Sequence, residues 1–298
     1  MTAASLRLRS SARQAAVLCM FAAACTVAGA EQILFYNASA GTAAIAAVDE
    51  DGSYAYLTSM KGFATGWTHV VGTPGGGLFF YKASTGQGAT AKRAGPGKYE
   101  YVGEIPGFAK GWTHITAVND GALLFYNATT GLGATGTLDG NGAYAFVKEI
   151  RGFAPGWTKV VGSASGAVLF YNGSDGTAAT ATVGRRGDYK YVGALSGFSR
   201  SWTHIAATGA GGLMFYDAAS GSGASATLGA GGNYAYVAEI PGFAKGWTHI
   251  VASSGHALLF YNRNTGLGAT ATIDRNGAYA FVREINGFAP GWSRIAAY

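Results

Sequence analysis

A repeat of 45 residues constrains the fold of this chain more than any other feature. The dipeptide Phe-Tyr occurs six times at this spacing, and all six tryptophans keep the same step. The segment EIPGFAKGWTHI stands at 104–115 and again at 239–250, so it is the same part of two units three repeats apart. A constant period of this length predicts an array in which each unit is one supersecondary motif. The Phe-Tyr pairs begin at Phe35, Phe80, Phe125, Phe170, Phe215 and Phe260.

Each unit is predicted to form four short strands. The apolar runs alternate with small or β-branched residues, and a hairpin-forming DGNG sequence stands at 139–142 of the third unit. No segment combines a helical period of apolar residues with a capping residue. Four strands and their short connections account for 45 residues, which is the length of a propeller blade. In the third unit the expected strands cover 122–127, 133–139, 143–150 and 157–162.

The two ends of the repeat array complement each other. The array starts at the strand ILFYN and stops at WSRIAAY, just after the sixth tryptophan. If the tryptophan strand is innermost, the last blade takes this strand from the C-terminus and its other three strands from the N-terminal part. An open solenoid would need distinct capping repeats, and none is visible. The sequence therefore predicts an all-β fold, a closed six-bladed β-propeller of four-stranded blades over residues 31–298.

Residues 1–30 are expected to be a secretory signal peptide. Three arginines precede an apolar run over 15–27, and the small residues 28–30 form a cleavage signal. The run is too short for a membrane span. A lipoprotein site at Cys25 is the weaker reading, because the aliphatic residue expected three positions earlier is missing. We expect a secreted or extracellular protein, with the periplasm as an alternative.

The composition of the mature chain excludes some partners and favours tight turns. Both cysteines lie within the signal, so the domain has no disulfide. Removing three arginines and no acid lowers the formal charge from +6 to +3, and no cluster of basic residues indicates a nucleic-acid partner. The 48 glycines combined with many aromatics fit short buried strands joined by tight turns, and do not fit disorder.

The phrase FAKGWTHI…ALLFYN resembles the glycine-tryptophan strand and following aromatic strand of tachylectin- and tectonin-type lectin propellers. It is at least as similar to the degenerate FG-GAP or VCBS-like repeats of secreted bacterial proteins. The resemblance covers 31–298, and its motifs are specific for architecture and weak for ligand. FG-GAP repeats often carry an acidic calcium loop, but here the matching loops hold a single aspartate, Asp120, too few oxygen ligands for calcium. We predict no calcium there; the loops are 72–77, 117–121, 162–166 and 252–256.

The candidate binding residues are the six tryptophans and the basic or titratable residues two positions after them. Residues two apart on a strand point to the same side, so the six +2 groups could form one ring at a channel and receive an anion or a hydroxylated ligand. Alternatively they cap strand ends and bond to neighbouring blades, and the tryptophans pack between blades. Four imidazoles are potential metal ligands, but no acidic residue lies at their level, and the lysine and arginine would oppose a cation, so we predict no metal. These residues are Trp67, His69, Trp112, His114, Trp157, Lys159, Trp202, His204, Trp247, His249, Trp292 and Arg294.

Three functions are compatible with these features. The first is a secreted, lectin-like protein that binds glycans or glycoconjugates through several weak, quasi-equivalent sites. The second is a structural or protein-interaction propeller that recognises a protein surface. The third is a hydrolase or lyase at the channel mouth, which we disfavour because the repeats are nearly uniform and catalytic sites need unlike residues at one place. We therefore expect no enzyme, no catalytic residues and no cofactor.

Overall fold

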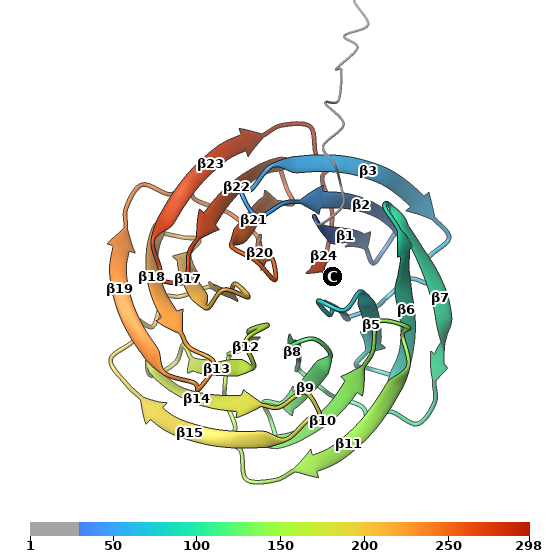
Figure 1. The fold of residues 1–298 in the computed structure, drawn as a ribbon, viewed down its shortest axis with the longest axis horizontal. Coiled ribbons are helices and arrows are strands. Elements are labelled where there is room, and N and C mark those ends of the chain that lie inside the picture. Colours follow the sequence, from blue (N-terminus) through green and yellow to red (C-terminus); the bar gives the residue numbers. More distant parts are fainter. Residues whose placement is uncertain (1–29) are drawn as a thin grey trace, which may run out of the picture.

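The structure is a computed structural model that describes residues 30–298, so the predicted signal peptide lies outside the described residues except for Ala30. Within this range the chain forms 24 strands and no helix. The strands make six four-stranded antiparallel sheets around a central axis, as Figure 1 shows. The predicted six-bladed β-propeller is confirmed. None of the described residues belongs to a helix that is long and apolar enough to cross a membrane.

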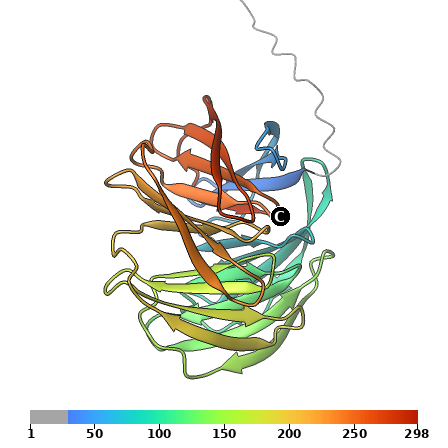
Figure 2. The same ribbon diagram turned by 60° about the vertical axis from the view of Figure 1, so that its left-hand side comes forward.

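We number the blades 1 to 6, beginning with the blade that contains both chain ends; the oblique view in Figure 2 shows the sheets following one another around the ring. From blade 1 to blade 6, the innermost strands are β24 (Arg294–Ala297), β4 (His69–Gly72), β8 (His114–Val118), β12 (Lys159–Gly162), β16 (His204–Ala207) and β20 (His249–Ala252). The second strands are β1 (Glu31–Asn37), β5 (Gly77–Lys82), β9 (Ala122–Asn127), β13 (Ala167–Asn172), β17 (Gly212–Asp217) and β21 (Ala257–Asn262).

The outer half of each blade follows the same order. The third strands are β2 (Thr42–Val48), β6 (Gln87–Gly95), β10 (Leu132–Leu138), β14 (Thr177–Val183), β18 (Ser222–Leu228) and β22 (Leu267–Ile273). The outermost strands are β3 (Tyr54–Lys61), β7 (Lys98–Ile105), β11 (Tyr144–Ile150), β15 (Tyr189–Leu195), β19 (Tyr234–Ile240) and β23 (Tyr279–Ile285).

Blade 1 closes the ring with strands from both ends of the chain. The order of its sheet is β24-β1-β2-β3, with Ile33 opposite Ala297 and Tyr36 opposite Arg294. Beyond β24, the backbone N–H of Tyr298 donates to the carbonyl of Gln32 at 2.9 Å. Figure 1 places the C-terminal end at the inner side of the ring, beside β1. The predicted closure is therefore confirmed, and no innermost strand is left without a second strand.

Packing between blades explains the composition of the second and third strands. The second strands are buried on both faces, as in the pattern BBBBBi of ALLFYN in β9, because each lies between two neighbouring blades. The third strands carry small residues where aromatic rings of the inter-blade connections press on them. A Cβ added to Gly133 would lie 2.3 Å from the ring of Phe153. Small residues there are thus required by the large rings opposite them.

Candidate functional site

Each of the six predicted +2 residues is the first residue of an innermost strand: four histidines, one lysine and one arginine. We call this end of the central channel the first mouth. Each group acts electrostatically on its ring neighbours: Lys159 on His114 and His204, and Arg294 on His69 and His249. The predicted arrangement at one level is therefore present, with the two cations on opposite sides of four imidazoles.

The four histidines of the first mouth bridge neighbouring blades. His69 Nε2 lies 3.1 Å from the carbonyl oxygen of Thr113, and its Nδ1 lies 3.0 Å from the hydroxyl of Thr68. A carbonyl only accepts, so Nε2 carries the proton. Nδ1 of the neutral ring then accepts the single hydrogen of the Thr68 hydroxyl, in competition with the carbonyl of Tyr81 at 3.0 Å. His114, His204 and His249 make the same inter-blade contact, to Thr158, Thr248 and Ser293.

Burial holds these imidazoles in the neutral form. Desolvation lowers the pKa of His69, His114 and His204, and it lowers the pKa of His249 to about 4. Both ring nitrogens are occupied by hydrogen bonds, so in this arrangement neither offers a lone pair to a substrate. The histidines consequently offer no general base in this arrangement.

Arginine and lysine behave differently at the first mouth. Arg294 reproduces the bridge, because its Nε donates to the carbonyl of Thr68 in the next blade. Lys159 does not: within residues 30–298 its ammonium group has no hydrogen bond, and burial lowers its pKa. The first mouth thus contains one cation held in a bridge and one cation without a protein partner.

The tryptophans lie against the phenylalanines of the second strands. Trp112 and Phe125 have their ring centroids 5.7 Å apart, and the five other pairs repeat this contact. Trp67, Trp112 and Trp247 are 6% exposed, whereas Trp157, Trp202 and Trp292 are half-buried. Each tryptophan thus packs in its blade, and ligand contact by any of the twelve predicted residues stays a prediction.

The opposite end of the channel, which we call the second mouth, holds a cavity of about 220 Å³. The ends of the innermost strands and the turns after them line it, together with Glu31, Asn119 and Ser254. The carboxylate of Glu31 accepts a hydrogen bond from the backbone N–H of Ser254. Burial raises the pKa of Glu31, while the bonds from Ser254 and the charge of Arg93 act in the opposite direction.

Glu31 belongs to a group of residues at the closure of the ring that depart from the repeat. Its counterparts 45 residues apart are four glycines and His256, and the counterparts of Arg93 are aliphatic. Gln32 is fully buried, donates to the carbonyl of Gly95 at 3.1 Å and accepts from the N–H of Gly97 at 3.1 Å. The hydroxyl of Tyr298 lies 3.5 Å from the side-chain carbonyl of Gln32. Unlike residues from both chain ends and from blade 2 therefore meet at one place.

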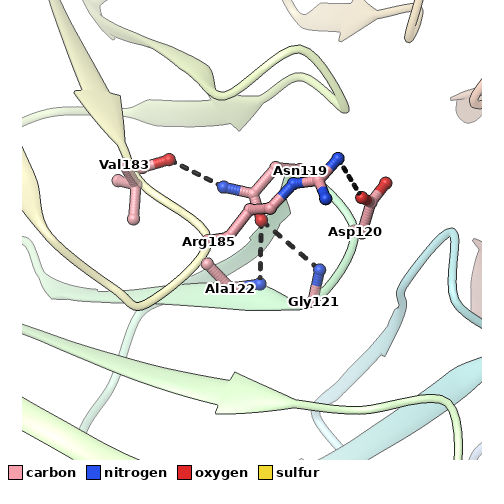
Figure 3. A network of polar contacts seen from close by, with 6 residues as sticks. All are labelled: Asn119, Asp120, Gly121, Ala122, Val183 and Arg185. Atoms are coloured by element: carbon pink, nitrogen blue, oxygen red, sulfur yellow. Dashed lines mark hydrogen bonds and ion pairs between the residues drawn. The ribbon is translucent and has the colours of Figure 1, made fainter.

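Asn119 also lines this cavity, but its side chain is used by the fold, as Figure 3 shows. Its Nδ2 donates to the carbonyl of Val183 at 2.7 Å, and its Oδ1 accepts from two backbone N–H groups of its own turn. Among the described residues it is the one non-glycine with positive φ, 50°; asparagine tolerates this conformation. The neighbouring Asp120 pairs with Arg185 at 2.6 Å. These contacts tie blade 3 to blade 4.

The sequence interpretation missed Glu31 as a cavity-lining residue, and Arg93 and Tyr298 as residues near it at the closure of the ring. A signal was present, because each departs from the residue type of its counterparts in the other repeats. Uniform repeats argue against catalysis only where single units do not depart from the repeat. No group of three or more His, Cys, Asp or Glu side chains is placed to hold a metal ion within residues 30–298.

Solved structures that share this fold include several lactonases. A candidate 6-phosphogluconolactonase from Bacteroides fragilis has a TM-score of 0.59 and 10% sequence identity, covering 92% of this chain and 98% of that one. The periplasmic gluconolactonase of Pseudomonas aeruginosa has a TM-score of 0.57 and 11% identity, covering 90% and 99%. A candidate 6-phosphogluconolactonase from Bacteroides uniformis has a TM-score of 0.56 and 16% identity, covering 88% and 84%. At these identities the likeness shows the fold. No protein-family model and no curated protein sequence matches the chain.

These comparisons correct two expectations. The prediction of a lectin-like glycan-binding protein is contradicted by neighbours named as gluconolactonase or candidate 6-phosphogluconolactonase, and its structural alternative is no better supported. The expectation that the chain is not an enzyme is contradicted by the same neighbours. Ring closure brings unlike residues together beside the second mouth, in an otherwise uniform repeat. The resemblance to lectin or FG-GAP repeats is supported only for the six-bladed propeller.

Proposed function

We propose that this protein hydrolyses a small lactone derived from a sugar acid, at the second mouth of its central channel. The observation that carries the proposal is the half-buried carboxylate of Glu31, which lines a cavity where the repeat symmetry is broken. The named activities of the structural neighbours supply the substrate class. The proposal needs both the geometry of Glu31 and the named activities of the neighbours, because one fold can host many chemistries.

Lactone hydrolysis needs one base that can also return a proton. A water oxygen attacks the carbonyl carbon, the bond from that carbon to the ring oxygen breaks, and the ring oxygen leaves as a hydroxyl. Glu31 takes one proton from the attacking water and gives it to the leaving oxygen, so one water is consumed and one hydroxy acid forms. A carboxylate whose pKa is raised by burial suits this role, because proton transfer is efficient when the pKa lies near the working pH.

Arg93 and Tyr298 have different roles in this proposal. Arg93 is half-buried, and its charge acts on Glu31, so its guanidinium would hold a negative substituent of the substrate or the oxyanion that forms on the carbonyl oxygen. Tyr298 is 1% exposed and contacts Gln32, so it is a positioning residue of the closure. Burial raises the pKa of its phenol, which therefore stays neutral.

The decisive experiment measures acid release from a panel of aldonic-acid lactones, with and without a phosphate group. Glu31→Gln should lower turnover at least about 100-fold, as expected for loss of a general base. Glu104→Gln, at an exposed carboxylate on the outermost strand β7, is the matched control and should leave turnover unchanged. Absence of turnover with every lactone, or full activity of Glu31→Gln, would refute the proposal.

We also propose export, as a domain of residues 31–298 released from the leader 1–30. The tripartite pattern of the leader supports it, and the Pseudomonas aeruginosa neighbour is periplasmic by name. Mass spectrometry of the protein recovered from the cell exterior or periplasm would test the cleavage site. A mature chain that still begins at Met1 would contradict it.

A further inference from the structure

Each blade presents one large aromatic side chain to solvent on its outermost strand. Exposing six rings of this size is unusual for a surface, and large exposed apolar groups often mark a binding site. Valines stand beside four of them, with 37–44% of their surface exposed. The six rings, exposed by 55–63%, belong to Tyr56, Tyr101, Phe146, Tyr191, Tyr236 and Phe281.

A β-bulge brings a carboxylate onto the face of this ring. In blade 6, Ala271 pairs with Phe281 and Ala269 pairs with Glu284, with a register shift between Thr270 and Ala271. Residues three apart on a regular strand point to opposite faces. The extra residue of the bulge reverses the alternation, so Phe281 and Glu284 share one face. All six blades carry this register shift.

The shared face forms one wall of a groove. In blade 6 the groove has a volume of about 290 Å³, and Trp247, Tyr279, Phe281 and Glu284 line it. Its other wall is the connection that follows the outermost strand of blade 5, which includes Phe243. Blades 3 and 5 have equivalent grooves of about 460 and 630 Å³, with Glu149 and Glu239 in the place of Glu284.

Blade 4 has the same groove without the carboxylate. Its volume is about 660 Å³, and Trp157, Tyr189 and Tyr191 repeat the aromatic lining. Ala194 stands where the other grooves have glutamate, and Arg151 contributes a positive charge to the lining. The chain therefore contains a natural comparison between aromatic grooves with and without a negative group.

The grooves differ in whether a neighbouring cation neutralises the carboxylate. Glu149 forms an ion pair with Arg151 at 2.6 Å. Glu239 and Glu284 take part in no ion pair within residues 30–298, and no lysine or arginine lines their grooves. The grooves of blades 5 and 6 thus combine aromatic rings with an unneutralised negative charge.

We propose that the grooves of blades 5 and 6 bind organic cations that carry a quaternary ammonium group. Aromatic ring faces attract such cations through the ring quadrupole, and the methyl groups of the cation bury against them. The carboxylate complements the charge and needs no hydrogen-bond donor from the ligand. A phosphate or carboxylate ligand is disfavoured because these two grooves offer a negative group and no cation.

The test compares choline with 3,3-dimethyl-1-butanol, its neutral carbon isostere, by calorimetry and by titration of tryptophan fluorescence on the whole protein. Choline should bind and the isostere should bind about fivefold more weakly, because it lacks both the charge pair and the cation–π attraction. Glu284→Gln and Phe281→Ala should each weaken or remove one site. Tyr191→Ala, in the groove without a carboxylate, is the matched control and should leave choline binding unchanged.

The variants are placed where the fold tolerates them. Phe281 is 61% exposed and Tyr191 55% exposed, so thermal unfolding should stay within a few degrees of the unmodified protein. Equal affinity for choline and its isostere, unchanged binding by Glu284→Gln, or no binding of choline would each overturn the proposal. The channel activity is a separate property, because these grooves lie at the outer rim and Glu31 lies at the second mouth.

Discussion

The hydroxyl of Tyr216 donates a hydrogen bond to the carbonyl of Ala244 at 2.7 Å and accepts one from the backbone N–H of Trp247 at 3.3 Å. The tyrosine lies on the second strand of blade 5, whereas its partners lie in the connection to the innermost strand of blade 6. Equivalent tyrosines in the other blades bond 28 residues ahead in the same way. One phenol per blade therefore fixes the path that the chain takes into the next blade.

Removal of this hydroxyl should destabilise the fold. Tyr216→Phe keeps the ring but leaves a carbonyl and an N–H group without their partner, which costs about 1–3 kcal/mol. Tyr236→Phe, at a ring 57% exposed on the outermost strand, is the matched control and should change the free energy of unfolding by less than about 0.5 kcal/mol. Urea unfolding measures both, and equal losses in the two variants would contradict this account.

Acid should weaken the ring through its histidines. The pKa of His249 is lowered to about 4 in the fold, from an ordinary value of 6.5, so the unfolded chain takes up the proton first. Stability is then complete above pH 6.5 and falls as the pH decreases from 6.5 to about 4, by on the order of 3 kcal/mol for this residue. His249→Gln should show a shallower decrease over this range in urea unfolding. An identical pH dependence in both proteins would exclude His249 as a cause.

A methyl group should be tolerated at one glycine and not at another. A Cβ on Gly162 would lie 2.1 Å from the carbonyl oxygen of Ala117 in the neighbouring innermost strand, whereas a Cβ on Gly193 would meet nothing within 4 Å. Gly162→Ala should cost about 3 kcal/mol or more, because backbone must move. Gly193→Ala should stabilise by about 0.4–1 kcal/mol through the unfolded state. Thermal unfolding of both variants decides the matter, and a stable Gly162→Ala would show that the inner strands are further apart.

Arg93 should determine the preference for charged substrates if the proposed hydrolysis occurs. Arg93→Met should raise KM for a phosphorylated or carboxylated lactone about tenfold, since a charge-assisted hydrogen bond is lost. The KM for a neutral lactone should change little. Steady-state kinetics with the paired lactones gives the comparison, and an equal rise for both would assign Arg93 to the structure of the closure.

The architecture could be predicted from the sequence because it repeats. The 45-residue period determined the blade, and the complementary ends determined which blade closes the ring. The sequence also predicted that the +2 residues lie at one level of the channel, and in the structure each of them is the first residue of its innermost strand. What the sequence left open was the partner of each ring nitrogen, since the acceptor of His69 is a backbone carbonyl in the next blade.

The second mouth could not be inferred from the uniform part of the repeat. Glu31, Arg93 and Tyr298 are far apart in the sequence and meet only because the ring closes between blades 1 and 2. From the sequence alone, Glu31 is recognisable only as the first residue after the predicted leader. The prediction of a lectin rests on near-identical units and takes no account of the positions at which single units differ.

One consequence follows from Lys159. Five junctions at the first mouth are joined by a side chain that reaches a backbone carbonyl of the next blade, and within residues 30–298 the junction from β12 to β16 is not. At the first mouth this junction is therefore the least bonded of the six, although the hydroxyl of Ser163 donates to the carbonyl of Thr208 at its other end. Local opening proceeds where stabilising contacts are fewest, so the amides of this junction at the first mouth should exchange with solvent before those of the other five.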